Sequence, residues 1–358
     1  MQVAILSKEN VMKRRMLLGV LVITLSLLWV FPVPGVLAAA PKYTVKLGCV
    51  EIPTSALCRG MEVFKSYTEG AAGGDIKVDL YTGGQLGDLA ELYEGVKSGL
   101  YQITQGDETI TGFYEPMVIL SIPYLFSNEL VVQKFFESDY FRKLNDDFAK
   151  KTGVRIIGAG VSGFRSFTNS KRPIKSMEDM KGLKIRVQPV PVMMELVKAL
   201  GASPTPIAWS ELYSALQQGV VDGQENPPAT ILDAKFYEVQ KHFTSDEHGL
   251  AWNLYYANEK WWKSLPANVR QIFWAGARLG ATVETGVRLH ENRVGAVKEL
   301  EKKGVQVYAA PVSLKEKFRA AAQPPVVDFL KKKVGAEVVD GAIKTVKEIE
   351  AQIARQAN

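Results

Sequence analysis

An arginine on a short strand is the first residue in this sequence that could bind a charged ligand. Residues 184–187 (Lys-Ile-Arg-Val) alternate in polarity, so we predict a strand in which Arg186 faces away from its apolar neighbours. A strand holds such a side chain rigidly, and the planar guanidinium can bind a carboxylate through two parallel hydrogen bonds. The ordinary alternative is a surface arginine paired with Asp or Glu, and these four residues alone favour that alternative.

Motifs of the common enzyme classes are absent from the sequence. It contains no Gly-x-Ser-x-Gly nucleophile motif, no Walker A phosphate loop and no His-Glu-x-x-His zinc motif. Residues 158–163 (Gly-Ala-Gly-Val-Ser-Gly) resemble a dinucleotide-binding loop only superficially, because the residues that follow predict a continuing strand and not a helix. The histidines His242, His248 and His290 have no His or Cys partner at metal-binding spacing. We therefore expect neither an enzyme nor a cofactor, and we assign no metal-ligating residues. Whether a metal ion accompanies a ligand is left open by the sequence.

The composition is that of an ordinary globular protein of 358 residues, with 47% hydrophobic and 23% charged residues. A chain of this length is expected to form two domains. The formal net charge of +6 includes basic residues near the N-terminus, and the other Lys and Arg residues are interspersed with Asp and Glu. We therefore expect no nucleic-acid partner. Cys49 and Cys58 could form one bridge in an oxidising compartment, but two unpaired thiols are the preferred interpretation.

The N-terminal residues have the pattern of an export signal. Basic residues 13–15 precede an apolar run over residues 16–30, and Pro32, Pro34 and three alanines at 38–40 follow it. A membrane-spanning helix is the alternative, but spanning takes about 20 apolar residues and this run is shorter. We predict a cleavable signal peptide over residues 1–40 and a mature protein in a bacterial periplasm.

Alternating strands and helices open the mature chain. Strands are predicted at residues 43–48 and 76–81, and helices are predicted after Ser55 and Asp88, which are N-cap residues before apolar positions at helical spacing. This order predicts βαβ units and mixed, mostly parallel sheets in an α/β fold. Further strands are predicted at residues 101–105, 154–159, 165–168, 183–187 and 220–224, and further helices at 129–151, 192–200 and 210–219.

The longest helical pattern covers residues 267–303. Apolar side chains recur on one face of it, and Gly276 fills the one gap in their spacing. A helix of this length measures about 55 Å, which exceeds the width of one domain, so we expect it to span two. Because no flexible linker separates the domains, we expect several chain crossings between them, as in a hinged binding protein. Residues from 313 onward are also predicted to be helical.

Several stretches carry motifs that are specific to a known family. Residues 163–173 read Gly-Phe-Arg-Ser-Phe-Thr-Asn-Ser-Lys-Arg-Pro, residues 182–189 read Gly-Leu-Lys-Ile-Arg-Val-Gln-Pro, and residues 219–227 read Gly-Val-Val-Asp-Gly-Gln-Glu-Asn-Pro. Gly-Gln-Leu-Gly at 84–87 and Ile-Pro-Tyr-Leu-Phe at 122–126 precede them. With these motifs in order over residues 43–305, the chain resembles the solute-binding subunits of tripartite ATP-independent periplasmic (TRAP) transporters.

The resemblance implies a two-lobed periplasmic binding protein with crossing hinge strands and a long helix that spans both lobes. Lobe I would comprise residues 41–162 and 251–290, and lobe II residues 163–250 and 291–358. Such a protein closes on an organic acid in the cleft between the lobes and delivers it to membrane permease subunits driven by an ion gradient, without catalysis or a cofactor. We expect a monomer. A ligand-sensing protein that presents the bound acid to a signalling receptor is the alternative.

The family motifs also supply candidate ligand-binding residues. The resemblance implies that Arg186 binds the ligand carboxylate, that Arg165 is a second arginine at the ligand, and that Asn226 hydrogen-bonds to the carboxylate. A hinge salt bridge is the alternative role for Arg165, and a turn before Pro227 is one for Asn226. Glu225 is a candidate partner that orients Arg186, or a hinge residue. Candidates for the cavity walls are Trp209, Tyr213, Trp252 and Asn253.

Apolar and acidic residues near the expected cleft bear on the kind of acid. Ile52, Ala56 and Leu89 stand about where relatives that bind sugar acids have polar residues. Buried hydroxyl groups without partners are costly, so these three residues favour a small 2-oxo, 2-hydroxy, dicarboxylic or aromatic acid. Asp107 and Glu108 could instead receive an ammonium group of an amino-acid-like ligand. Their preferred interpretation is an N-cap residue and a first-turn acid of a helix.

Overall fold

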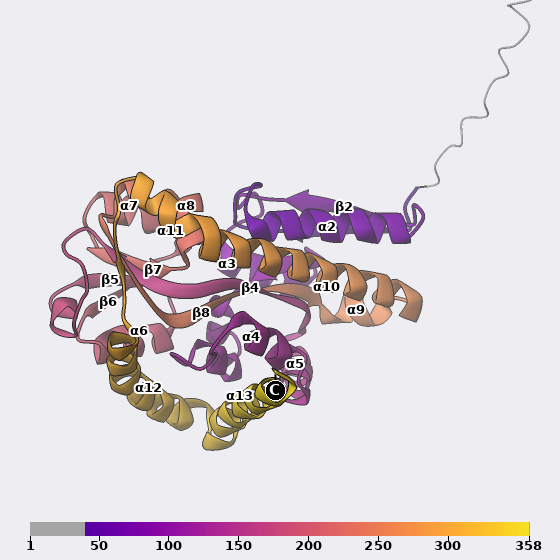
Figure 1. Cartoon of the computed structure of the whole chain (residues 1–358). Helices are drawn as coiled ribbons and strands as arrows, with labels where there is room; N and C mark the ends of the chain where they lie inside the picture. Colours follow the sequence, from indigo (N-terminus) through magenta and orange to yellow (C-terminus); the bar gives the residue numbers. More distant parts are fainter. Residues whose placement is uncertain (1–39, 358) are drawn as a thin grey trace, which may run out of the picture. The chain divides into compact units, whose positions relative to one another are not determined.

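The computed structural model describes residues 40–357, and the chain from Pro41 onward forms one compact unit. The predicted signal peptide lies outside the described residues, except for Ala40. Within the described residues, no helix is long and apolar enough to cross a membrane. Strands and helices alternate along this unit, and the elements form an α/β fold with a central sheet (Figure 1).

One mixed sheet organises the described chain. Its strand order is β2-β1-β3-β8-β4-β7-β5-β6, and β9 pairs with the edge of β8. Strand β1 runs parallel to β2 and β3, and β5 runs parallel to β6 and β7, whereas the central pairs β3/β8, β8/β4 and β4/β7 are antiparallel. The strands are β1 (Tyr43–Gly48), β2 (Ile76–Tyr81), β3 (Ile103–Gly106), β4 (Val154–Asn169), β5 (Lys184–Val187), β6 (Ser203–Pro206), β7 (Gly223–Asn226), β8 (His242–Asn258) and β9 (Gln306–Ala309).

Helices begin where the sequence supplies caps. The Ser55 side chain accepts a hydrogen bond from the Cys58 amide, and Asp88 forms a reciprocal capping box with Glu91, as the N-cap predictions require. The α-helices are α2 (Ala56–Ala71), α3 (Leu89–Ser98), α4 (Glu129–Phe136), α5 (Asp139–Thr152), α6 (Pro191–Ala199), α7 (Leu212–Gln217), α8 (Pro228–Asp233), α9 (Glu259–Ser264), α10 (Ala267–His290), α11 (Val297–Lys302), α12 (Val312–Val334) and α13 (Ala336–Ala357).

Two long central strands join the two ends of the sheet. The first half of β4 pairs with the second half of β8, which also pairs with β3, and the second half of β4 pairs with β7 and the first half of β8. The strands predicted at 154–159 and 165–168 are therefore one strand, bent by register shifts such as the one between Val161 and Gly163. The predicted lobe boundaries near 162 and 251 fall at this bend and remain a prediction.

Two other helical predictions differ from the structure in where helices break. The helix expected over 129–151 is two helices, because Ser138 caps a new helix by accepting a hydrogen bond from the Phe141 amide. The C-terminal helical region divides at Gly335, whose φ of +93° suits glycine. Helix α12 contacts α6, whereas α13 contacts α4, so the C-terminal segment touches parts of both predicted lobes.

The long predicted helix is continuous over residues 267–302, with α10, a π-helical stretch at Glu291–Ala296 and α11 in succession. It lies beside α2 and passes along β4 (Figure 1). Glycines make the close approach possible: a Cβ atom at Gly280 would lie 2.6 Å from the Gly60 carbonyl oxygen, and one at Gly158 of β4 would lie 2.9 Å from the Ala277 carbonyl oxygen. Gly276 and Gly280, which weaken this helix intrinsically, thus allow it to pack closely against α2.

Alanine substitutions at two glycines of α10 test whether this helix packs closely against α2. Gly280→Ala should lower the free energy of unfolding by about 1–3 kcal/mol, because the new methyl group meets backbone atoms of α2. Gly286→Ala should raise it by up to about 1 kcal/mol, because that site faces open space and alanine favours the helix. Urea denaturation of both variants measures the difference, and equal stabilisation by both substitutions would contradict the close approach of α2 and α10.

Candidate functional site

A cavity of about 360 Å³ lies where β4 and β8 meet the ends of β3, β5 and β7. Seven of the nine predicted site residues line it, namely Asp107, Arg165, Arg186, Trp209, Asn226, Trp252 and Asn253. A larger hollow of about 660 Å³ lies elsewhere on the molecule, and its lining includes the exposed side chains of Trp274 and Arg278. We take the smaller cavity as the candidate site, because two buried arginines face it.

Arg186 is placed in the cavity by the alternation of β5. Ile185 and Val187 are fully buried on the other face of the strand, and Arg186 is 1% exposed. Its Nε donates a hydrogen bond to the Ile207 carbonyl oxygen at 2.9 Å, whereas its Nη1 has no hydrogen-bond partner within the described chain. Burial lowers the pKa of Arg186 to about 10, so the group is still charged at neutral pH. The strand thus presents an unsatisfied cationic donor.

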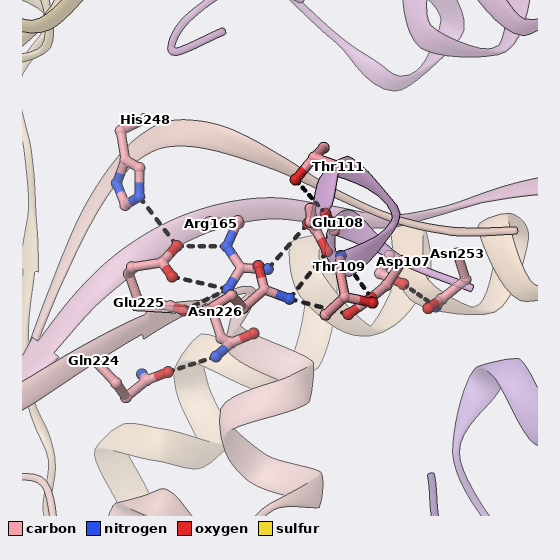
Figure 2. Close-up of polar contacts among 12 residues, drawn as sticks. Asp107, Glu108, Thr109, Thr111, Arg165, Gln224, Glu225, Asn226, His248 and Asn253 are labelled. Atoms are coloured by element: carbon pink, nitrogen blue, oxygen red, sulfur yellow. Dashed lines mark hydrogen bonds and ion pairs between the residues drawn. The ribbon is translucent and has the colours of Figure 1, made fainter. Parts of the chain in front are cut away.

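Arg165 carries its own counter-ions. Its Nε pairs with Glu225 Oε2, its Nη2 donates to Glu225 Oε1 at 2.9 Å, and its Nη1 donates to Glu108 Oε1 at 3.3 Å (Figure 2). Burial would raise the pKa of Glu225, but the charge of Arg165 and hydrogen bonds from His248 and Arg165 outweigh it and lower the pKa to about 2. Glu225 therefore orients Arg165. Within the described chain it makes no hydrogen bond to Arg186, so the expected contact that would orient Arg186 is not seen.

His248, which has no metal-binding or catalytic motif around it in the sequence, completes this network. Its Nδ1 lies 2.8 Å from Asp246 Oδ2 and its Nε2 lies 3.3 Å from Glu225 Oε2, with all three side chains fully buried. Burial would lower the pKa of His248, but the charge of Asp246 and the hydrogen bonds to both carboxylates raise it to about 9. The histidine is therefore protonated at neutral pH. The sequence signal for this contact was the spacing of His248 and Asp246, which are two residues apart on β8 and therefore on the same face of the strand.

Asp107 and Glu108 line the cavity, and both accept hydrogen bonds from Gln188. Gln188 Nε2 donates to Asp107 Oδ2 at 3.0 Å and to Glu108 Oε2 at 3.1 Å. The predicted capping role is also present, since Asp107 Oδ1 accepts hydrogen bonds from the Thr109 amide and hydroxyl. Burial raises the pKa of both acids, that of Glu108 to about 7. Gln188 Oε1 is buried without a hydrogen-bond partner in residues 40–357, so this side of the cavity offers acceptors.

Gln188 was missed by sequence reasoning, although it stands two residues from Arg186 and alternation places both on one side of the chain. Other lining residues that it missed as site residues include Gln105 and Glu51. Gln105 Nε2 donates to Asn253 Oδ1 at 3.2 Å, and Asn253 Nδ2 donates to Glu284 Oε1 at 2.6 Å. The predicted wall residue Asn253 is thus fixed by a buried network that reaches the long helix.

The remaining predicted residues divide between the cavity and its surroundings. Asn226 Nδ2 donates a hydrogen bond to Gln224 Oε1 at 2.6 Å (Figure 2). The side-chain carbonyl oxygen of Asn226 takes no part in this hydrogen bond. Trp252 is 1% exposed, and its Nε1 has no hydrogen-bond partner among the described residues. Tyr213 does not line the cavity, and its hydroxyl donates a hydrogen bond to Glu238 Oε2 at 2.5 Å. The expectation that Tyr213 forms a wall is therefore not met by the structure.

Comparison with known proteins connects this site to a family. Residues 48–333 match bacterial extracellular solute-binding proteins, family 7. The sialic acid-binding periplasmic protein SiaP of Vibrio cholerae is 31% identical over 309 residues, which are 86% of this chain and 94% of the relative. A sugar acid-binding protein from Advenella mimigardefordensis in complex with galactonate has a TM-score of 0.82 and 29% identity, with 87% of this chain and 99% of that chain covered.

A third similar structure is a TRAP periplasmic solute-binding protein from Desulfovibrio salexigens with bound orotic acid. It has a TM-score of 0.80 and 29% identity, and covers 87% of this chain and 99% of that chain. The chain belongs to family 7 of the bacterial extracellular solute-binding proteins. The predicted family and the two-lobed α/β fold class are thereby confirmed. Members of this family are solute-binding subunits of transport systems.

The His248 network predicts a pH dependence of stability. Because folding raises the pKa of His248 from 6.5 to about 9, its contribution is complete below about pH 6.5 and is lost as the pH rises through about 9. His248→Asn should therefore reduce the loss of unfolding free energy between pH 6.5 and 9.5, as measured by urea denaturation across this range. His242→Asn, at a partly exposed histidine, is the control. An unchanged pH profile in His248→Asn would show that the histidine is not charged in the folded protein.

Proposed function

We propose that this protein captures an organic acid in the cavity and delivers it to an ion-gradient-driven TRAP permease. The observation that supports this proposal most directly is the buried Arg186 guanidinium, whose Nη1 lacks a hydrogen-bond partner within the described chain. A ligand carboxylate supplies both the missing acceptor and a counter-charge. Named ligands of the relatives include sialic acid, galactonate, orotic acid and C4-dicarboxylates, which are all acids and support this assignment.

The acceptor side of the cavity narrows the kind of acid. Gln188 Oε1 is unsatisfied in the described chain, and Asp107 and Glu108 lie beside it, so the ligand carries a hydrogen-bond donor such as a hydroxyl or amine there. A second carboxylate at this position would face two acidic side chains, and close like charges are costly. We therefore propose a monocarboxylic acid with a donor group and disfavour a dicarboxylic acid.

Two of the three apolar residues expected to disfavour a polyhydroxylated ligand lie outside the cavity lining. Leu89 lines the cavity as expected, but Ile52 is 45% exposed and neither Ile52 nor Ala56 lines it. Polar lining residues such as Gln105 and Ser162 are available to hydroxyl groups. A hydroxylated monocarboxylic acid therefore fits the proposal.

We propose the predicted lobes, 41–162 with 251–290 and 163–250 with 291–358, as the bodies that close on the ligand. The Ser210 hydroxyl donates a hydrogen bond to Asp88 Oδ2 at 2.7 Å, and these residues line or adjoin the cavity from the two predicted lobes. This contact supports a closed arrangement. A ligand that bridges both lobes stabilises the closed state by population shift. The transport role fits the family better than the signalling alternative.

The other parts of the assignment follow from the sequence. We propose that residues 1–40 are a cleaved signal peptide that exports a monomer to the periplasm, with no catalysis and no nucleic-acid partner. The apolar run and the alanines at 38–40 support cleavage near residue 40.

Substitution of Arg186 tests carboxylate binding. Arg186→Ala should weaken binding of the ligand acid by roughly 30-fold to several-thousand-fold, because truncating one partner of a buried charged pair costs about 2–5 kcal/mol. Arg186→Lys keeps the charge but loses the planar fork, so it should bind with intermediate affinity. Calorimetry measures both, with the ligand identified by mass spectrometry of material released from the denatured protein. Arg142→Ala, at an exposed arginine, is the control. Folded Arg186→Ala that binds within about twofold of wild type would refute the assignment.

Substitution of Asp107 tests the acceptor side. Wild type should bind a monocarboxylic acid more tightly than the analogue that carries a second, distal carboxylate. Asp107→Asn should narrow this difference by roughly tenfold, because it removes one repelling charge while the amide oxygen can still cap Thr109. Matched pairs of acids are compared by calorimetry, with the exposed Asp139→Asn as the control variant. Tighter binding of dicarboxylic acids by both proteins would contradict the proposed charge selection.

A further inference from the structure

Two cysteines meet beneath the wall of the ligand cavity. Cys49 follows β1, Cys58 lies in the first turn of α2, and their Sγ atoms are 2.8 Å apart. This separation is shorter than the optimum of about 3.5–4.0 Å even for unbonded carbon atoms. Both side chains are buried, at 1% and 0% exposure, and the sequence contains no other cysteine. We propose that Cys49 and Cys58 form a structural disulfide in the exported protein.

Little movement separates the two thiols from a bond. A disulfide has an S–S distance of about 2.05 Å, so the sulfur atoms need to approach by less than about 1 Å. Both sulfurs also contact the Glu51 carbonyl oxygen, at 3.7 and 3.4 Å. That oxygen keeps the Gly83 amide as a donor at 2.7 Å when the S–H groups are lost. Oxidation therefore leaves no buried acceptor without a partner at this position.

The surroundings of the thiols determine when the bond forms. The hydrogen bond with Cys58 and burial raise the pKa of Cys49 far above its ordinary value, so the reactive thiolate is disfavoured in the folded protein. The bridge is accordingly made during folding after export, while the thiols are still accessible. Two thiols lose two protons and two electrons as the S–S bond forms, and the disulfide of a periplasmic thiol oxidoreductase accepts them and becomes a dithiol.

The bridge would fix the segment that forms one side of the cavity. Val50 and Glu51 lie between the cysteines and line the cavity. The Val50 amide donates to Gln105 Oε1 at 2.9 Å, and Glu51 Oε2 lies 3.3 Å from Arg288 Nη2 on the long helix. A covalent link from Cys49 to Cys58 closes this loop onto α2. It therefore restrains the cavity wall without contacting the ligand.

Thiol counting on the exported protein tests the proposal directly. Protein purified from the periplasm is unfolded in denaturant in the presence of a maleimide reagent, which labels free thiols. The intact mass of the protein is then measured. The expected result is no adduct without prior reduction and two adducts after reduction with dithiothreitol. Two adducts without reduction would overturn the proposal. This readout needs no ligand and no variant, so it is independent of the proposed transport function.

A double variant tests the structural role. Cys49→Ala with Cys58→Ala should melt at least about 3 °C below the exported wild type, because the loop closed by the bridge is freed. Backbone amides of residues 50–57 should also exchange hydrogen faster in the variant. Dithiothreitol should lower the melting temperature of wild type and leave that of the variant unchanged. An equal effect of dithiothreitol on both proteins, or unchanged exchange of residues 50–57, would show that no bridge restrains this segment.

Discussion

Burying a guanidinium group is costly unless its charge and its donors are matched, and the ligand cavity is built around that constraint. Arg165 meets it with the carboxylates of Glu225 and Glu108, and Arg288 meets it with three carboxylates around it. Arg186 has one backbone carbonyl as its hydrogen-bond partner within the described chain. In the proposed function, the carboxylate of an acid ligand matches the charge of Arg186.

The central strands bring the charged partners of Arg165 to one place beside the cavity. Strand β4 brings Arg165, the neighbouring β7 brings Glu225, and β8 brings His248, so three different strands supply one buried ionic cluster. The close approach of the long helix to β4 depends on glycines such as Gly158, where a side chain would meet the helix backbone. Helix, strands and cavity are therefore positioned by one packing arrangement.

Features set by neighbouring residues were predictable from the sequence. The strand at 184–187 and the caps at Ser55 and Asp88 depend on alternation and on short side-chain contacts, and the structure has all three. The glycines at 158–163 show the limit of such reasoning. They resemble a ligand-binding loop in sequence, but they lie within β4, where the long helix packs on the sheet. Helix breaks such as Ser138 were also missed, because the apolar periodicity continues across the break.

Partnerships across strands were not predictable. Glu225 pairs with Arg165 because β7 lies against β4 in a register that the sequence does not reveal. Tyr213 has the aromatic character of a wall residue, yet the position of Glu238 decides where its hydroxyl lies. Motif resemblance placed Arg186 in the cavity, whereas only the three-dimensional arrangement shows that Glu225 is already used by another arginine.

The proposed selectivity of this cavity rests on the hydrogen-bond partners that its two sides lack. Arg186 needs an acceptor with negative charge, whereas Gln188 needs a donor and stands beside Asp107 and Glu108. An acid with a hydroxyl or amine near its carboxylate matches both sides. An acid with a second carboxylate gains binding free energy at Arg186 and loses it at Asp107 and Glu108, since like charges in a buried site repel strongly.

Because the raised pKa of Glu108, about 7, allows that group to take up a proton, lowering the pH weakens this repulsion. Discrimination against dicarboxylic acids should therefore be stronger at pH 8 than at pH 6.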